Sequence, residues 1–405
     1  MEIGHQNFVV KNSKSNGFYL SILTMLFFIW GFITCLNDIL IPHLKSSFSL
    51  NYTQAMLIQF SFFTAYFIIS IPAGMLIEKI GYQKGIVVGL ITAGIGSLMF
   101  IPSANFLSYV LFLVALFILA SGITILQVAA NPYVVVLGKP ETASVRLNLT
   151  QAFNSLGTTI APYIGSVLIL SSVSSAATVK MPYFVISVVL VGLGILFSFI
   201  KLPKIVHTTD AEAEEISEKK HKSIFEYKHL VLGVVAIFVY VGAEVSIGSF
   251  LVNYFNVLVG LKEADAAKFV TFYWGGAMVG RFIGSALQRI IKPNLLLAIN
   301  AIMASVLVIL SMLTNGYVAV FSILLVGFFN SIMFPTIFSL SLAKLGRFTE
   351  KGSGLLCMAI VGGAIIPVIQ GVIADNIGIH HAFILPVLCY LYISFFGFKG
   401  YKPQI

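Results

Sequence analysis

The stretch KLPKIVHTTDAEAEEISEKKHKSIFEYK, from Lys201 to Lys228, is the longest polar segment in a chain of 405 residues. Six of the 15 acidic residues lie in it, which is typical of a solvated linker. On each side of it the sequence contains six apolar runs of about the 20 residues that a membrane-spanning helix needs. The segment therefore predicts two six-helix bundles, residues 1–200 and 229–405, joined by a linker at 201–228.

The twelve apolar runs predict an all-α membrane protein. They cover residues 18–43, 54–78, 85–102, 107–137, 147–170, 182–200, 229–257, 266–288, 294–313, 317–343, 353–374 and 380–398. Each run is continuous, whereas a membrane β-barrel alternates apolar and polar residues. The first run is too long for the core of a signal peptide, so we expect it to be retained as a span.

The composition excludes several classes of protein. Charged residues make up 10% of the chain and hydrophobic residues 58%, against about 25% charged in soluble domains. A cytosolic enzyme, a disordered chain and a soluble nucleic-acid binder are therefore excluded, despite a net charge of +9. In a membrane protein the positions of Lys and Arg indicate instead which loops face the cytoplasm.

The distribution of Lys and Arg predicts the orientation in the membrane. Only four of the 24 basic residues, Lys45, Lys180, Lys262 and Lys268, fall on one side of the predicted spans, and Arg281 lies within a span. The other nineteen fall on the side of both termini and the linker. The positive-inside rule places that side in the cytoplasm.

Two acidic residues lie deep in apolar runs. We predict that they gain and lose the proton that a proton-coupled carrier moves together with its substrate. Asp38 lies within the predicted run 18–43 and Glu244 within 229–257. A charged carboxylate inside a membrane span is costly and is usually functional. The alternative is a fixed ion pair with Arg281, the only deep basic residue. The chain has no phosphate-binding loop, nucleophile elbow or metal-ligand cluster, so we expect no enzyme activity, cofactor or metal.

Polar side chains form stripes at helical spacing, as expected for a helix facing a bundle interior or a watery cavity. Carboxamides suit sugar hydroxyls, and aromatic rings suit the apolar face of a pyranose. The alternative role for each Asn or Gln is a hydrogen bond between helices. We predict these substrate-binding residues: Trp30, Asn37, Asp38, Gln127, Asn131, Gln151, Asn154, Glu244, Tyr273, Trp274 and Asn330.

The two halves of the chain echo each other. Gly157 and Pro162 recur as Gly362 and Pro367, each 205 residues later. Such repeats are found in transporters that bind their substrate between two related bundles. The matching positions favour alternating access, in which the two halves move against each other around a site near the midplane.

The short segment GMLIEKIGYQKG, Gly74 to Gly85, resembles the signature between helices two and three of the major facilitator superfamily. The resemblance implies a cytoplasmic gate in which an acid at a helix end pairs with basic residues. We assign this gating role to Gly74, Glu78, Gly81 and Lys84, with Lys79 beside them and Arg281 in the other half.

Longer stretches resemble the fucose:proton symporter family, which includes bacterial glucose/galactose transporters. They are LNDILIP (36–42), QVAANPYVVVLG (127–138), RLNLTQAFNSLG (146–157), YVGAEVSIGSFL (240–251) and FPTIFSLSLAKLG (334–346). The resemblance implies a proton-coupled sugar symporter of the bacterial inner membrane. It also implies that Asp38 is the coupling aspartate and that Gln151 and Asn154 are cavity amides. We expect the protein to be a monomer.

Three positions depart from the fucose transporter's pattern. Gln127 stands where that transporter has a glutamate, Glu244 where it has a glutamine, and Phe334 where it has a tyrosine. These changes argue against L-fucose itself and fit the glucose/galactose branch. Sodium coupling and an uncoupled facilitator or exporter of another small solute are the alternatives to proton symport. The expected partners are a sugar, the coupling ion and the lipid bilayer, with no nucleic acid.

Overall fold

A computed structural model describes residues 13–48, 52–165, 179–200, 202, 223–261 and 263–403. Within these ranges the side chains of 13–16, 36–43, 45–47, 52–56, 59, 162–165, 263–265, 267 and 268 are not described. Most of the predicted linker, 203–222, therefore lies outside the described residues. The boundaries of the two predicted domains stay a prediction.

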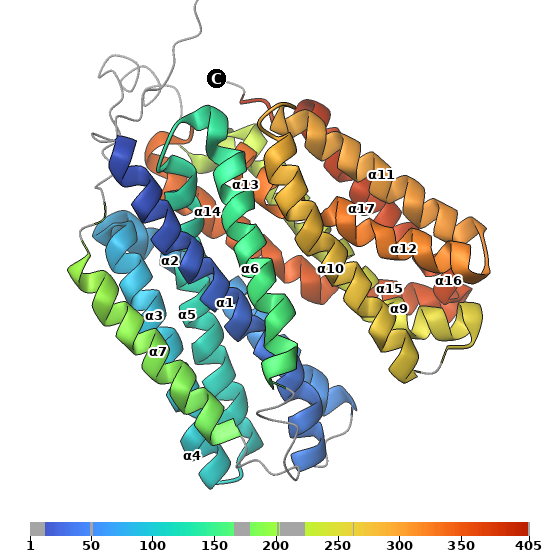
Figure 1. Cartoon of the computed structure of the whole chain (residues 1–405), viewed down its shortest axis with the longest axis horizontal. Helices are drawn as coiled ribbons and strands as arrows, with labels where there is room; N and C mark the ends of the chain where they lie inside the picture. Colours follow the sequence, from blue (N-terminus) through green and yellow to red (C-terminus); the bar gives the residue numbers. More distant parts are fainter. Residues whose placement is uncertain are drawn as a thin grey trace, which may run out of the picture.

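The first half of the chain folds into helices that pack together on one side of the molecule (Figure 1). They are α1 (Ser13–Ser47), α2 (Tyr52–Ile80), α3 (Tyr82–Leu98), α4 (Phe100–Asn105), α5 (Tyr109–Val136), the short η1 (Pro140–Thr142), α6 (Ala143–Gly165) and α7 (Lys180–Phe199). Together α3 and α4 correspond to the third predicted span. α5 continues through Pro132 and ends four residues later.

The second half forms the other side of the molecule (Figure 1). Its elements are η4 (Ile224–Glu226), α9 (Lys228–Val259), α10 (Glu263–Leu287), α11 (Pro293–Leu313), α12 (Gly316–Asn330), α13 (Met333–Ser341), η5 (Gly346–Phe348), α14 (Thr349–Met358), η6 (Ala359–Val361), α15 (Gly362–Ile377), α16 (Ile379–Ala382), α17 (Ile384–Phe395) and the π-helix η7 (Phe396–Gly400). The tenth predicted span is interrupted at 331–332, just before Pro335 in the first turn of α13.

All twelve predicted spans are present as helices, so the predicted fold class is confirmed. Within the described residues, ten helical stretches are long and apolar enough to cross a membrane. α6 and α10 are not among these ten, and they pack against each other between the two halves (Figure 1). α6 and α10 are less apolar than the other ten stretches, and both carry polar side chains into the interface between the halves.

Close approach between helices depends on small residues, as expected where no hydrophobic effect draws helices together in lipid. An ideal Cβ on Gly96 of α3 would lie 2.3 Å from the backbone nitrogen of Leu119 in α5. One on Gly122 of α5 would lie 2.2 Å from the backbone nitrogen of Ala93. Any larger residue at either position would force the two helices apart.

The two halves meet through a limited set of helices. In the first half α6 packs against α10 and α13, while α2 and α5 pack against α14. Gly74 of α2 lies directly against α14, because an ideal Cβ there would be 2.8 Å from the Glu350 carbonyl oxygen. The candidate functional residues lie along these contacts.

Candidate functional site

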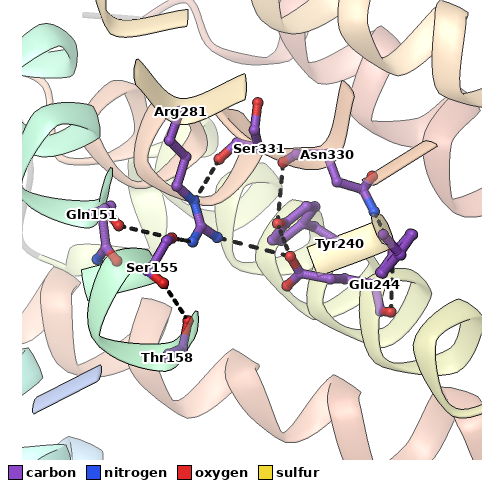
Figure 2. Close-up of polar contacts among 9 residues, drawn as sticks. Gln151, Ser155, Thr158, Tyr240, Glu244, Arg281, Asn330 and Ser331 are labelled. Carbon is purple, nitrogen blue, oxygen red and sulfur yellow. Dashed lines mark hydrogen bonds and ion pairs between the residues drawn. The ribbon is translucent and has the colours of Figure 1, made fainter. Parts of the chain in front are cut away.

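Glu244 lies at the centre of a polar cluster in the second half (Figure 2). Its Oε1 accepts a hydrogen bond from the Tyr240 hydroxyl at 2.7 Å and lies 3.9 Å from Nη2 of Arg281. The side chains of Glu244 and Arg281 are 14% and 15% exposed. The bond from Tyr240 confirms that the i, i+4 spacing places these two residues on one helix face.

Arg281 links this acid to the other half of the molecule. Its Nε donates to the Ser331 carbonyl at 3.0 Å, and its Nη1 donates to the hydroxyl of Ser155 in α6 (Figure 2). One guanidinium therefore contacts α9, the α12–α13 break and the opposite bundle. The ion pair with Glu244 was the alternative that the sequence left open, and the structure contains it.

Two further residues predicted to bind substrate, Asn330 and Tyr273, form a hydrogen-bonded chain that ends at the backbone of Glu244. Asn330 and Tyr273 are both fully buried, and the Asn330 amide donates to the Tyr273 hydroxyl at 2.7 Å. The Tyr273 hydroxyl in turn donates to the backbone carbonyl of Glu244 at 3.3 Å. The side chain of Trp274, the next residue, is 43% exposed and lies edge-on to the Tyr273 ring.

A second polar group lies in the first half, on α5 and α6. Gln127 donates to the Tyr66 hydroxyl at 2.5 Å, and Gln151 donates to Asn131 Oδ1 at 3.5 Å. Asn131 is fully buried, and its Nδ2 has no hydrogen-bond partner among the described residues. The structure thus brings Gln151 and Asn131 together as the stripes predict, and leaves one amide donor unused.

Asn154 and Trp30 lie where α6 meets α1. The Asn154 amide donates to the Phe27 carbonyl at 2.9 Å, and an ideal Cβ on Gly31 would lie 2.2 Å from the Asn154 carbonyl oxygen. Trp30 is 6% exposed and packs on the Phe27 ring. In this structure the Asn154 amide makes the interhelical hydrogen bond that was the alternative to sugar binding. The side chains of Asn37 and Asp38 lie outside the described residues.

Of the residues assigned to gating, Gly74 and Glu78 lie against α14 at one end of the contact between the halves, whereas Arg281 lies beside Glu244. Glu78 pairs with Lys351 of the opposite half at 3.1 Å, with both side chains more than one-third exposed. Gly81 precedes α3 with a φ of +82°, a conformation that favours glycine. Among the described residues, the ion pair of Glu78 thus involves Lys351 of the second half, whereas we had expected basic partners in the same segment, Lys79 and Lys84.

Sequence reasoning missed the uncharged contacts between the halves. Asn148 of α6 donates to Gln288 Oε1 at 2.8 Å, and the hydroxyls of Ser144 and Ser339 lie 2.6 Å apart. A hydrophilic stripe on α6 was visible in the sequence, but the partners lie 140 and 195 residues away. No group of His, Cys, Asp and Glu that could hold a metal is found in the part of the chain that the structure describes.

The structure has helices at twelve places in two packed halves, and ten helical stretches of the described residues are long and apolar enough to cross a membrane. Together with a partly buried ion pair whose arginine also contacts the opposite half, this arrangement is typical of a secondary transporter. The family model of the Major Facilitator Superfamily matches residues 19–359. The chain belongs to that superfamily and, within it, to the family of the fucose symporters. It is therefore a multi-pass membrane transporter and not an enzyme.

Comparisons with known proteins support this membership. A glucose/galactose transporter of Brucella abortus is 58% identical over 399 residues, covering 96% of each chain. The L-fucose-proton symporter of Escherichia coli is 36% identical over 409 residues, covering 95% of this chain and 93% of that protein. A crystal structure of FucP, a transporter of this superfamily, in the outward conformation is similar, with a TM-score of 0.87 and 34% identity over 96% of this chain and 100% of that one.

Proposed function

We propose that the protein is a proton-coupled symporter that brings a glucose- or galactose-like hexose into a bacterial cell by alternating access. The relatives named for glucose/galactose transport and L-fucose–proton symport support the substrate and the ion. The observation that carries the proposal is the contact of Arg281 with Glu244 on one side and with Ser155 of the other half on the opposite side.

The proposed coupling step is the protonation of Glu244. A carboxylate at this depth costs about 3 kcal/mol or more unless it is paired, and Arg281 supplies the pair. A proton on Glu244 removes the negative charge and weakens its attraction for the guanidinium. Arg281 then changes its hold on Ser155, so that the charge on one bundle alters the contact with the other.

The proposed sugar contacts are carboxamides of the first half and aromatic rings of the second half. Carboxamides offer both donors and acceptors, as a hexose does. Asn131 is fully buried in this state, and its amide nitrogen, which lacks a partner among the described residues, is the proposed donor to a sugar hydroxyl once the site opens. The half-exposed Trp274 offers an aromatic surface.

Asp38 is the second acid in the proposal, and its role rests on the resemblance to the symporter family. It lies on α1, which packs against α6. We propose that Asp38 and Glu244, one in each half, together set the dependence on the proton gradient. The proposed topology, with both termini in the cytoplasm of the bacterial inner membrane, rests on the positive-inside rule.

The experiment is uptake into proteoliposomes over a panel of sugars, with proton and sodium gradients imposed separately. We expect accumulation of glucose or galactose when the outside is acidic, and alkalinisation of the outside when sugar is added. Accumulation that follows only a sodium gradient would favour the sodium-coupled alternative. Equilibration without accumulation under either gradient would favour a facilitator and contradict the proposal.

A further inference from the structure

A layer of uncharged side chains joins the two halves where α6, α10 and α13 meet. Gln288, just after α10, is 4% exposed and lies at the centre of this layer. Its Oε1 accepts from Asn148 Nδ2 of α6 at 2.8 Å, and its Nε2 donates to the Thr336 hydroxyl of α13 at 2.7 Å. Asn148 Nδ2 also lies 3.2 Å from that hydroxyl, so three buried side chains share one network.

Three more hydrogen bonds extend the layer across the interface. The Ser144 and Ser339 hydroxyls lie 2.6 Å apart, and the Ser285 hydroxyl donates to the Val145 carbonyl at 3.2 Å. On the side of α14, the Ser353 hydroxyl donates to the Val128 carbonyl of α5 at 3.0 Å. The four hydroxyl-bearing side chains are at most 5% exposed. These contacts connect both α5 and α6 of the first half with three helices of the second.

The ion pair at the same end of the molecule differs in character. Glu78 and Lys351 are 36% and 39% exposed, and exposed ion pairs are screened by water and salt. Buried hydrogen bonds are not screened in this way, and each buried partner left unsatisfied adds a penalty. The contacts that hold this end shut are therefore expected to be the uncharged ones, not the signature acid.

Uncharged side chains also suit a contact that must break in every cycle. When the halves separate, water replaces each lost hydrogen bond, so the net free-energy difference for neutral groups is small. With an ion pair in their place, both charges would lose their water, at a large desolvation penalty, each time the halves closed. A carboxamide such as Gln288, which donates on one side and accepts on the other, makes the closed state specific without making it permanent.

We propose that Gln288 is a gating residue of the transport cycle, whose carboxamide clamps Asn148 of the first half to Thr336 of the second in the state seen here. The hydrogen bonds from Asn148 to Gln288 and Thr336 must break before this end of the molecule can open, whereas the bond between Gln288 and Thr336 lies within the second half and can persist. The inference depends on the chain being a transporter that opens to each side in turn. It does not depend on the proposed sugar or coupling ion.

The test is a distance measurement on the full-length protein without sugar. Spin labels are attached at Lys139→Cys and Lys292→Cys, two exposed positions on opposite halves at this end. Cys35, the one cysteine that is not buried, is replaced by alanine. We expect Gln288→Leu to raise the ratio of long to short distances about fivefold, the change for the loss of one hydrogen bond between the halves.

The matched control is Ser305→Ala, which removes a buried hydroxyl whose hydrogen bond, among the described residues, is to the Ala301 carbonyl of its own helix. Thr336→Val removes the other end of the clamp and must shift the distances in the same direction, so the test stands even if one variant fails to fold. A distance distribution unchanged within twofold in both clamp variants would overturn the proposal. Because no sugar is present, failure of the proposed function would appear only in the uptake assay.

Discussion

Replacing Glu244 by glutamine removes the charge that faces Arg281 while it preserves the size of the side chain. At a separation of 3.9 Å, and with an effective dielectric constant of about 20, the attraction between the two groups is about 4 kcal/mol. The amide oxygen of glutamine can still accept the hydrogen bond from Tyr240. The variant therefore isolates the charge, and we expect a loss of stability of about 3–5 kcal/mol, as for other buried pairs that lose one partner.

The transport assay separates coupling from binding. We expect Glu244→Gln to reduce sugar accumulation driven by a proton gradient at least tenfold. Exchange of labelled for unlabelled sugar across the membrane should continue. Sugar exchange needs the two halves to move but needs no net proton transfer. If Glu244→Gln accumulates sugar against its gradient as the unmodified protein does, Glu244 is not a coupling residue.

A charge-balanced double variant controls for damage to the fold. Combining Glu244→Gln with Arg281→Gln leaves no unpaired charge at this position, so thermal stability in detergent should recover most of the loss. Accumulation should stay absent, because no ionisable group remains at this position. Recovery of accumulation together with stability would mean that the pair has a structural role only, and would refute the coupling argument.

Three further outcomes follow from the geometry. Cysteines at Ser144 and Ser339, whose hydroxyls lie 2.6 Å apart, should form a disulfide that lowers uptake at least tenfold until a reductant is added, and uptake that is equal with and without reductant would contradict the closed contact. Gly31→Ala places a Cβ 2.2 Å from a backbone oxygen of α6 and should cost about 1–3 kcal/mol; thermal unfolding that is unchanged would show that α1 and α6 can move apart freely. Lys351→Ala removes only an exposed ion pair worth about 0.2–1 kcal/mol, so uptake should stay within about threefold, and a larger loss would assign the closing role to the charges instead.

The membrane fold could be predicted because hydropathy alone determines where a helix can cross a bilayer. A charged or polar interruption every 20 to 30 residues marks the span ends, and the structure contains a helix at each of the twelve places. The internal breaks could not be predicted in the same way. The separation of α14 from α15 by η6 occurs in the apolar sequence Ala359–Val361, which has no proline or charge.

The ion pair between Glu244 and Arg281 could be predicted because charges are so rare inside the spans that few pairings are available. Uncharged pairs give no such signal. Asn148, Gln288 and Thr336 are common residues in helices, and their meeting depends on how two bundles fit together over 140 and 188 residues of intervening chain. That fit is determined by packing along the whole interface, which no local pattern records.

The two kinds of contact between the halves differ in a way that matches what each has to do. Arg281, the charged link, reaches Ser155 next to the one described acid deep in the membrane, where a change of protonation has its largest effect on energy. The uncharged layer around Gln288 contains no group that gains or loses a proton near neutral pH. Its strength therefore stays constant while the charge at Glu244 changes. A transporter with this arrangement would respond to the proton at Glu244, while the layer around Gln288 stabilises the closed end by a constant free energy. The proton would therefore shift the balance between the states without breaking the closing contacts directly.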